Sequence, residues 1–346
     1  MGLLNATVTA IMIVGLASSS PQHLDKLLEP GNLVTHSEQV LDIADEWTKF
    51  KRLFLKSFSP EENIKRFNIF QENWKRIDVL KKQFQNGELD FEVGITQFAD
   101  LTKEEFIEKH LTLKVPHGKF KRGLSTRSNR TVRHVPEFLD WRTRGAITPV
   151  KQQGQCASCW AFSVVGSLET QHFLKHGTLV SLSEQNLIDC SVDEVNSGCS
   201  GGWMANAFNY LKSHSISSEK YYPYKGVQET CVSKRTFQVS IQDFHQLAAD
   251  EMILLESVAS VGPIAVAIDA SNLQFYAGGV FRDHECVPDR VNHGVLVVGY
   301  GVEAGRDYWL VKNSWGESWG EAGYFKIIRN NNNHCNIASY GMHPIL

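Results

Sequence analysis

The cysteines divide this chain into two unlike parts. All seven lie after residue 155, at positions 156, 159, 190, 199, 231, 286 and 335. Because the number is odd, at least one thiol stays unpaired, and the other six could form three disulfides in 15 ways. If the chain reaches an oxidising compartment, its C-terminal part should therefore be a cross-linked domain that keeps one free thiol.

The N-terminus indicates such a compartment. Residues 6–17 form an uncharged, mostly apolar run that is followed by Ser18-Ser19-Ser20-Pro21. This run is too short to cross a bilayer, but with Ala17 and Ser19 spaced as signal peptidase requires it is typical of a secretory signal. We expect residues 1–19 to be a signal peptide, with a buried N-terminal helix as the alternative. No later segment is apolar enough to predict a membrane span.

The two parts also differ in charge. Residues 20–134 carry 20 basic and 17 acidic side chains, whereas residues 135–346 carry 15 and 21, so their net charges are +3 and −6. The whole chain has a net charge of −3, which gives no general electrostatic reason to expect nucleic acid as a partner. The opposite signs favour a basic segment that docks on an acidic domain of the same chain.

The first part follows helical patterns. Ser59-Pro60-Glu61-Glu62 combines an N-cap, a first-turn proline and a glutamate three residues after the cap, so a helix should begin there. Its aromatic stripe predicts that it runs to about Gln85. Three further elements are expected: a helix that carries Trp47, Phe50 and Phe54, a short strand at 91–95, and a helix that starts near Thr102.

Residues 115–133 are rich in Lys, Arg, Ser and Gly and poor in apolar side chains, as in a linker. A solvated basic linker and a protease-sensitive processing site are the two interpretations of this segment. Asn129-Arg130-Thr131 lies within it and is a glycosylation sequon, which makes Asn129 a candidate glycosylation site.

The second part mixes helix and strand patterns. Helical spacing over 161–168, ended by Lys175-His176-Gly177, predicts one helix, and a second should start near Ser181 with Glu184 three residues later. Short apolar runs bounded by glycine or charge predict buried strands at 262–268, 294–299 and 307–312.

One thiol stands where it should be reactive. Cys159 directly precedes the first of these helices, where free N–H groups and the helix dipole favour a thiolate. His293 opens one apolar strand and Asn313 closes another, and both lie far downstream of Cys159. The Cys156-x-x-Cys159 pair could instead be half of a zinc site or a redox dithiol, but the sequence has no second Cys-x-x-Cys. We therefore predict no metal site.

Four motifs carry a resemblance to a known family. They are Gln-Gly-Gln-Cys-Ala-Ser-Cys-Trp-Ala-Phe at 153–162, Gly-Cys-Ser-Gly-Gly at 198–202, Asn-His-Gly at 292–294 with Val-Gly-Tyr-Gly at 298–301, and Lys-Asn-Ser-Trp-Gly-Glu-Ser-Trp-Gly at 312–320. With them, the chain from about Trp47 onward resembles the papain-like cysteine proteases, and within these the cathepsin L-like group. The resemblance implies an α+β, two-lobed papain-like fold with a helical lobe and a β-barrel-like lobe, preceded by a helical pro-domain.

The resemblance implies a role for each matching residue. Cys159 matches the nucleophile and His293 the general base and acid, which together form a thiolate–imidazolium pair. Asn313 matches the residue that orients the imidazole, and Trp315 the indole that shields this hydrogen bond from water. Gln153 matches the side-chain donor that stabilises the oxyanion together with the backbone N–H of Cys159. The implied reaction is hydrolysis of peptide bonds through an acyl-enzyme, without a cofactor.

Substrate-binding residues and disulfides follow from the same resemblance. Gly201 and Gly202 match glycines whose backbone pairs with an extended substrate. The other expected substrate contacts are Asn292, Trp315 and the apolar S2 residues Trp203, Met204, Ala267, Val291 and Tyr340. An apolar S2 pocket shortened by Tyr340 predicts a preference for hydrophobic P2 residues. The implied disulfides are Cys156–Cys199, Cys190–Cys231 and Cys286–Cys335.

The first part resembles the inhibitory propeptide of this group. Glu62, Arg66, Phe70, Asn73 and Ile77 fit its interspersed helical motif, with Lys81 in place of the final asparagine. A second motif, Gly94-x-Thr96-x-Phe98-x-Asp100, has threonine where asparagine is usual. The implied domains are residues 20–134 as propeptide and 135–346 as the mature protease. Protonation of carboxylates such as Asp100 should weaken docking and activate the zymogen at acid pH.

The expected partners are protein and peptide substrates, the chain's own propeptide as an intramolecular inhibitor, and cystatin-type inhibitors. A monomer in the secretory pathway, in the lysosome or the extracellular space, is expected, and no loop resembles the one that makes cathepsin B an exopeptidase. A non-catalytic binding relative is the competing class, but it should have lost Cys159, His293 or Gln153. A second alternative is a chain that acts mainly as an inhibitor through its pro-region.

Overall fold

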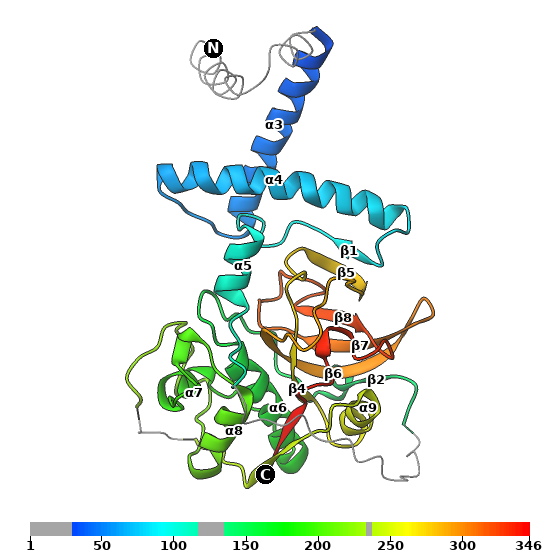
Figure 1. Ribbon diagram of the computed structural model, residues 1–346. Coiled ribbons are helices and arrows are strands. Elements are labelled where there is room, and N and C mark those ends of the chain that lie inside the picture. Colours follow the sequence, from blue (N-terminus) through cyan, green and yellow to red (C-terminus); the bar gives the residue numbers. More distant parts are fainter. Residues whose placement is uncertain (1–29, 117–134, 233–236) are drawn as a thin grey trace. The chain divides into compact units, whose positions relative to one another are not determined.

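The computed structural model describes residues 30–116, 135–232 and 237–346, with side chains from residue 42 onward (Figure 1). The expected signal peptide, most of the basic linker and Asn129 lie outside these residues. Within the described ranges, no helix has the length and apolar character needed to cross a membrane. The chain divides into two compact units, residues 1–71 and 72–346, and each is described by itself.

The first unit contains helix α3 (Pro30–Leu53) and the first half of helix α4 (Pro60–Gln85). The predicted start of α4 is confirmed, because the hydroxyl of Ser59 accepts the backbone N–H of Glu62. The predicted aromatic stripe forms the unit's core, in which the Trp47 ring lies 5.2 Å from that of Phe70. Helix α3 ends one residue before Phe54, whose ring still packs 5.2 Å from Phe50.

The second unit begins with the rest of α4, strand β1 (Phe91–Val93) and helix α5 (Lys103–His110). The predicted start near Thr102 is confirmed, because the Thr102 side chain accepts the N–H of Glu105 while the Glu105 carboxylate accepts the N–H of Thr102. This capping box satisfies two N–H groups that a helix start otherwise leaves unpaired.

Nine strands form the sheet of this unit, in the order β1-β5-β8-β7-β6-β4-β9-β3, and β2 pairs with β6. The three predicted strands are β4, β6 and β7. The bounds are β2 Leu139–Asp140, β3 Asp243–Gln246, β4 Ile264–Ile268, β5 Tyr276–Phe281, β6 His293–Glu303, β7 Arg306–Lys312, β8 Tyr324–Ile328 and β9 Met342–Ile345. β6 and β7 are antiparallel neighbours, so the start of β6 lies beside the end of β7.

Four α-helices accompany the sheet: α6 (Cys159–His176), α7 (Glu184–Cys190), α8 (Met204–Ser213) and α9 (Glu251–Ser260). Short 3-10 turns lie at Trp141–Arg144, Gly198–Ser200 and His334–Asn336. Helix α6 ends as predicted at Gly177, whose φ of 73° suits glycine. The second predicted helix is present as α7, but it starts two residues later than Ser181, because Leu182 forms a β-bridge with Ser218 and the cap is Ser183.

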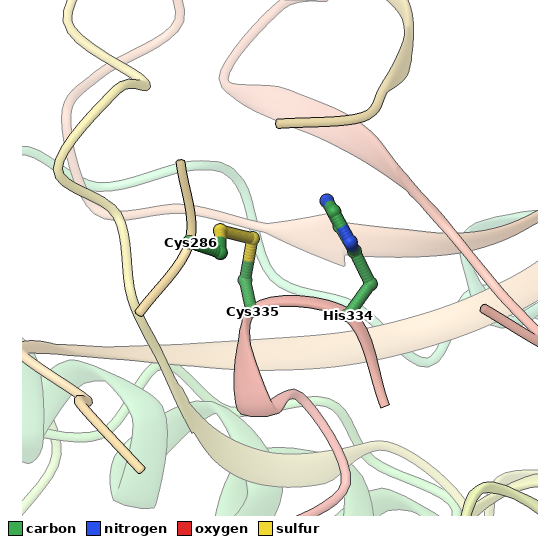
Figure 2. Close-up of side chains that lie close together, drawn as sticks. All are labelled: Cys286, His334 and Cys335. Atoms are coloured by element: carbon green, nitrogen blue, oxygen red, sulfur yellow. A yellow bond between two sulfur atoms is a disulfide. The ribbon is translucent and has the colours of Figure 1, made fainter. Parts of the chain in front are cut away.

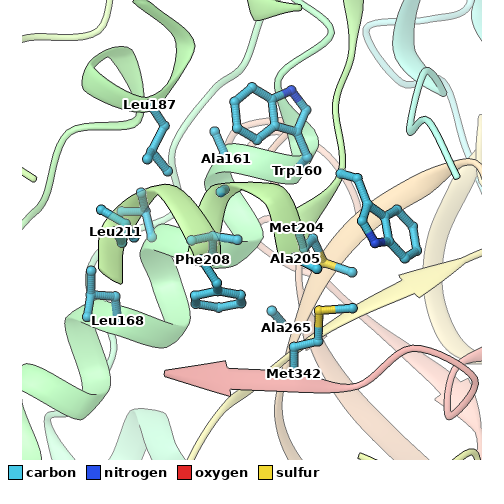
Figure 3. Close-up of a cluster of buried hydrophobic side chains, with 14 of the residues drawn as sticks. Trp160, Ala161, Leu168, Leu187, Met204, Ala205, Phe208, Leu211, Ala265 and Met342 are labelled. Carbon is cyan, nitrogen blue, oxygen red and sulfur yellow. The ribbon is translucent and has the colours of Figure 1, made fainter. Parts of the chain in front are cut away.

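Helices α6, α7 and α8 share one apolar core with the edge of the sheet (Figure 3). Leu168 of α6, Phe208 of α8 and Met342 of β9 are all fully buried in it. Figure 1 shows these helices gathered on one side and strands β5–β8 on the other. The α+β, two-lobed arrangement is therefore confirmed, and it places the first residue of α6 next to the start of β6.

Candidate active site

Cys159 is the first residue of α6 and is completely buried. It is also the free cysteine of the chain, because the other six are joined as Cys156–Cys199, Cys190–Cys231 and Cys286–Cys335, the pairs that the resemblance implies. The helix start places unpaired N–H groups around its sulfur. Hydrogen bonds from the backbone of Gly294, Trp160 and Cys159 itself act to lower the pKa of this thiol.

His293 and Asn313 meet across two neighbouring strands. His293 begins β6, Asn313 follows β7, and Nε2 of the imidazole donates to Oδ1 of Asn313 at 2.8 Å. This bond leaves Nδ1 as the proton-accepting nitrogen, and Nδ1 has no hydrogen-bond partner among the described residues. Gly294 packs directly on the helix start, since a Cβ added there would lie 3.1 Å from the carbonyl oxygen of Cys159. The backbone after His293 thus touches the residue that carries the thiol.

Trp315 covers the imidazole. Its ring stacks on that of His293 with 4.7 Å between centroids, and Trp319 packs edge-on against it at the same distance. Both tryptophans are fully buried. Water is therefore excluded from the hydrogen bond between His293 and Asn313, as expected from the resemblance.

Ser314 makes hydrogen bonds with both the backbone and the side chain of Gln153. The Gln153 backbone N–H donates to the Ser314 carbonyl at 2.8 Å, and the Gln153 Oε1 accepts the Ser314 hydroxyl at 2.7 Å. Residues 153–158 lead to Cys159 and are called here the nucleophile loop. Within this loop, Nε2 of the Gln153 side chain donates to the carbonyl of Cys156 at 3.1 Å. Gln153 is fully buried, so this donor is fixed rather than solvated.

Burial sets the charge state of the pair in this structure. It raises the pKa of the Cys159 thiol to about 11 and lowers the pKa of His293 to about 4, although the bond to Asn313 acts in the opposite direction on the imidazole. A neutral thiol and a neutral imidazole are therefore favoured while both are covered. The thiolate–imidazolium pair that the resemblance implies requires the site to be opened to water or substrate.

An extended piece of chain, residues 111–116, lies over the site and is called here the covering segment. The N–H of Leu113 donates to the carbonyl of Asn292 at 3.1 Å, and the N–H of Lys114 donates to the carbonyl of Gly202 at 3.0 Å. At Gly201 the backbone of Thr112 comes so close that any side chain would collide with it. Three of the predicted substrate-binding residues thus already hold a peptide backbone.

The predicted S2 residues also come together. Leu113 of the covering segment belongs to one buried apolar cluster with Cys159 and all five of them, namely Trp203, Met204, Ala267, Val291 and Tyr340. The rings of Trp203 and Tyr340 meet edge to face at 5.2 Å. No sequence motif marks Leu113, because its position over the S2 residues depends on the course of the backbone.

Contacts before the covering segment were also missed by sequence reasoning. Gln97 donates from Nε2 to the carbonyl of Trp315 at 2.6 Å, and Thr96 donates to the carbonyl of Gln274 at 2.6 Å. Phe98 and Phe106 pack on the Trp315 ring at 5.2 and 5.5 Å. Gln97 lies inside the second propeptide motif, at a position that the motif leaves open, and this motif was its only available signal.

A second grouping of ligand-type side chains lies away from Cys159 (Figure 2). The sulfurs of Cys286 and Cys335 and a ring nitrogen of His334 lie within 4.8 Å of one another. The sulfurs are bonded to each other, however, and a disulfide does not supply the thiolates that bind zinc. His334 instead accepts the backbone N–H of Asp283 at 2.9 Å. Together with the disulfide, this bond holds the segment 283–286 against residues 334–335.

Comparisons with known proteins agree with this geometry. Residues 135–345 match the papain family cysteine protease model, and residues 47–106 match the cathepsin propeptide inhibitor domain (I29). The chain is 45% identical over 305 residues to digestive cysteine proteinase 3 of Homarus americanus, covering 86% of this chain and 94% of that protein. It is 44% identical over 319 residues to cathepsin L1 of Drosophila melanogaster, covering 88% and 85%.

A solved structure is similar over the same region. The digestive procathepsin L 3 of the Tenebrio molitor larval midgut superposes with a TM-score of 0.81 at 42% identity, covering 88% of this chain and 99% of that one. Both the propeptide and the protease regions therefore have close counterparts. This chain belongs to the papain family of cysteine proteases, as a cathepsin L-like endopeptidase made as a zymogen.

Proposed function

We propose that Cys159, His293, Asn313 and Gln153 carry out peptide-bond hydrolysis in this enzyme. The observation that carries the proposal is the 2.8 Å bond from His293 Nε2 to Asn313, which leaves Nδ1 to serve a thiol at the start of α6. In the opened site His293 Nδ1 takes the proton of Cys159, and Sγ attacks the carbonyl carbon of the substrate. The Cys159 N–H and Gln153 Nε2 stabilise the oxyanion.

The second half of the reaction returns the groups to their starting state. His293 gives its proton to the leaving amine as the C–N bond breaks, which leaves an acyl group on Sγ. A water molecule then loses a proton to Nδ1 and attacks the acyl carbon, and the thiolate leaves. The substrate backbone would use the carbonyls of Asn292 and Gly202, which the covering segment now occupies. Inhibition by the propeptide is therefore competition for the same hydrogen bonds.

We expect the zymogen to be activated by acid. Burial lowers the pKa of His293 from 6.5 to about 4, so between these pH values an uncovered imidazole takes up a proton and a covered one does not. Trp315 and Trp319 stay on the imidazole after the propeptide leaves, so uncovering restores only part of this pKa shift. Proton uptake by the uncovered state makes the covered state less stable as the pH falls from 6.5 toward 4, by less than about 3 kcal/mol.

Maturation of the purified zymogen should therefore be at least about tenfold faster at pH 4.5 than at pH 7. Mass spectrometry over time gives the rate and the new N-terminus, which we place near Val135. Cys159→Ala zymogen incubated alone is the control and should remain full length at both pH values. Equal rates at the two pH values would contradict the proposed role of His293 burial.

We further propose a preference for hydrophobic P2 residues. The S2 cluster offers apolar and aromatic side chains, and Tyr340 is 8% exposed at its edge. A library varied at P2 should show Leu, Val and Phe preferred over Arg. Tyr340→Glu places a carboxylate there and should raise cleavage of substrates with Arg at P2, relative to those with Leu at P2, by about tenfold, whereas Tyr340→Phe should not. A wild-type preference for Arg would refute this proposal.

The domain limits and location are proposed on the same basis. The two family matches, at 47–106 and 135–345, support a propeptide over residues 20–134 and a mature protease over 135–346. Three disulfides and relatives described as digestive proteinase and cathepsin support passage through the secretory pathway to the lysosome or the extracellular space. Cystatin-type inhibitors and a monomeric state stay predictions.

A further inference from the structure

A tyrosine outside the residues discussed so far links the two ends of the nucleophile loop. The hydroxyl of Tyr224 donates to the backbone carbonyl of Gln153 at 2.7 Å and lies 2.9 Å from the hydroxyl of Ser158. A phenol has one proton to donate. Since that proton goes to Gln153, Ser158 is the donor to Tyr224 at 2.9 Å, which is closer than its other acceptor, the Cys156 carbonyl at 3.4 Å. The three groups form one directed chain.

The position of this chain relates it to the oxyanion. Gln153 supplies the side-chain donor, and Ser158 directly precedes Cys159, whose N–H is the second donor. The only other hydrogen bond to the Gln153 carbonyl in the described structure is a long one of 3.4 Å from the N–H of Cys156. Tyr224 therefore makes the shorter hydrogen bond to the Gln153 carbonyl and joins it to the side chain of the residue before Cys159.

Tyr224 is itself well anchored. Its ring packs edge to face on Phe162 of α6 at 5.1 Å, and its backbone N–H donates to the carboxylate of Glu219 at 2.7 Å. Ser314 holds the backbone N–H and the side-chain oxygen of Gln153, and Tyr224 holds its backbone carbonyl. Hydrogen bonds linked in a chain polarise and strengthen one another in a buried site. Removal of the phenol oxygen would remove the hydrogen bond to the Gln153 backbone carbonyl and leave the packing of the ring on Phe162 intact.

We propose that Tyr224 is a positioning residue. It holds the Gln153 side-chain amide and the backbone N–H of Cys159 where both can donate a hydrogen bond to the oxyanion. The proposal rests on the proposed function of Gln153 and Cys159 and adds a residue that acts through both. It concerns stabilisation of the tetrahedral state and not formation of the thiolate. Tyr224 should therefore affect reactions that place an oxygen in the oxyanion hole and spare those that do not.

The test is Tyr224→Phe in the acid-matured enzyme. We expect kcat for a fluorogenic peptide to fall about 3- to 10-fold with KM changed less than twofold, as for the loss of one neutral, partly buried hydrogen bond. Binding of a peptide aldehyde should weaken by the same factor, because Sγ adds to its carbonyl carbon and the carbonyl oxygen enters the hole. The rate at which iodoacetamide alkylates Cys159 should stay unchanged, since displacement of iodide forms no oxyanion.

Two tyrosines allow a matched control. The hydroxyl of Tyr222 donates to Asp189 at 2.8 Å and accepts the backbone N–H of Val232 at 3.3 Å, and neither bond leads to Gln153 or Ser158. Tyr222→Phe should leave kcat and aldehyde binding unchanged. Gln153→Ala is the reference for full loss of the side-chain donor, about 100- to 1000-fold in kcat.

Two results would overturn the proposal. One is that Tyr224→Phe matches Tyr222→Phe in kcat and aldehyde binding; the other is that alkylation slows by the same factor as kcat, which would assign the effect to the thiol or to the fold. If Tyr224→Phe does not mature, Ser158→Ala removes the other end of the chain and should give the same pattern. Failure of the proposed function itself is distinguishable, since Gln153→Ala would then be as active as wild type.

Discussion

Cys159→Ala is expected to lose peptide hydrolysis by more than about 10,000-fold in kcat. The alanine cannot form the acyl-enzyme, and no other thiol can take over, because the remaining six cysteines are bound in disulfides. Hydrolysis of a Phe-Arg fluorogenic peptide by wild-type and variant protein, both freed of the propeptide, measures the difference.

The same variant needs a control for folding. Mature wild-type enzyme added in trans should cut the Cys159→Ala zymogen to a product with the same N-terminus as the wild type, because the side chain lies at a helix start and its loss leaves the surrounding core intact. A correctly processed variant that kept a tenth of the wild-type activity would show that another group is the nucleophile.

Lys151→Met should have the largest effect on stability. Its ammonium lies 3.0 Å from Glu169 and 2.7 Å from Glu184, and it also donates to the carbonyl of Leu182 at 2.9 Å. Both carboxylates are almost completely buried. Removal of the cation leaves two anions close together without a counter-charge, and such a change typically costs about 3–5 kcal/mol.

The pH dependence of this loss has a definite sign. Burial already raises the pKa of Glu184 to about 7, above the ordinary 4.5, so the stability tied to this group is lost as the pH rises through that range. The Lys151 ammonium acts to lower the pKa of the Glu184 carboxyl, so without it this pKa should rise further. The free energy of unfolding lost by Lys151→Met should therefore be larger at pH 7.5 than at pH 5, as measured by urea denaturation in a Cys159→Ala background that prevents autolysis.

Lys225→Met is the matched control for this prediction. Lys225 pairs with Glu229 at 2.6 Å, a shorter distance than the Lys151–Glu169 contact, but both partners are about half exposed. Exposed pairs contribute about 0–1 kcal/mol, so the control should change little. Equal losses for Lys151→Met and Lys225→Met would contradict the assignment of a buried charge cluster.

This cluster reaches the active site. Lys312 directly precedes Asn313, and its ammonium donates to the carbonyl and hydroxyl of Thr148 at 2.8 and 3.0 Å. The Thr148 hydroxyl in turn donates to Glu169 at 2.6 Å. Burial lowers the pKa of Lys312 to about 8. The end of β7, which presents Asn313 to His293, is therefore tied to α6 through charged and polar groups.

Much of the local structure could be predicted because its signals are local. The Ser59-Pro60 start of α4, the Thr102 capping box and the Gly177 end of α6 each depend on residues within one or two turns of the chain. The start of α7 could not be predicted in this way. There a long-range bridge from Leu182 to Ser218 holds the backbone extended past Ser181, where the local pattern favours a helix.

For the active site, the sequence predicted the catalytic residues but not the residues that hold them in place. The positions of Cys159, His293 and Asn313 followed from motifs and from the elements on which they lie. The bond from Gln97 to Trp315 joins residues 218 apart in sequence, and Lys151, Glu169 and Glu184 look like ordinary surface charges in the sequence although they form one cluster. Such partners have no local signature, because only the pairing of strands and the packing of α6 bring them together.

The most direct test of the account is alkylation of Cys159 before and after maturation. Zymogen and acid-matured enzyme are both treated with iodoacetamide at pH 7, and peptide mass spectrometry locates and times the adduct. We expect rapid labelling of Cys159 in the matured enzyme, at the same rate as activity is lost. In the zymogen, where burial raises the pKa of the thiol to about 11, we expect labelling to be slower by at least about tenfold. Equal labelling of Cys159 in the two forms, or full activity after its alkylation, would contradict it.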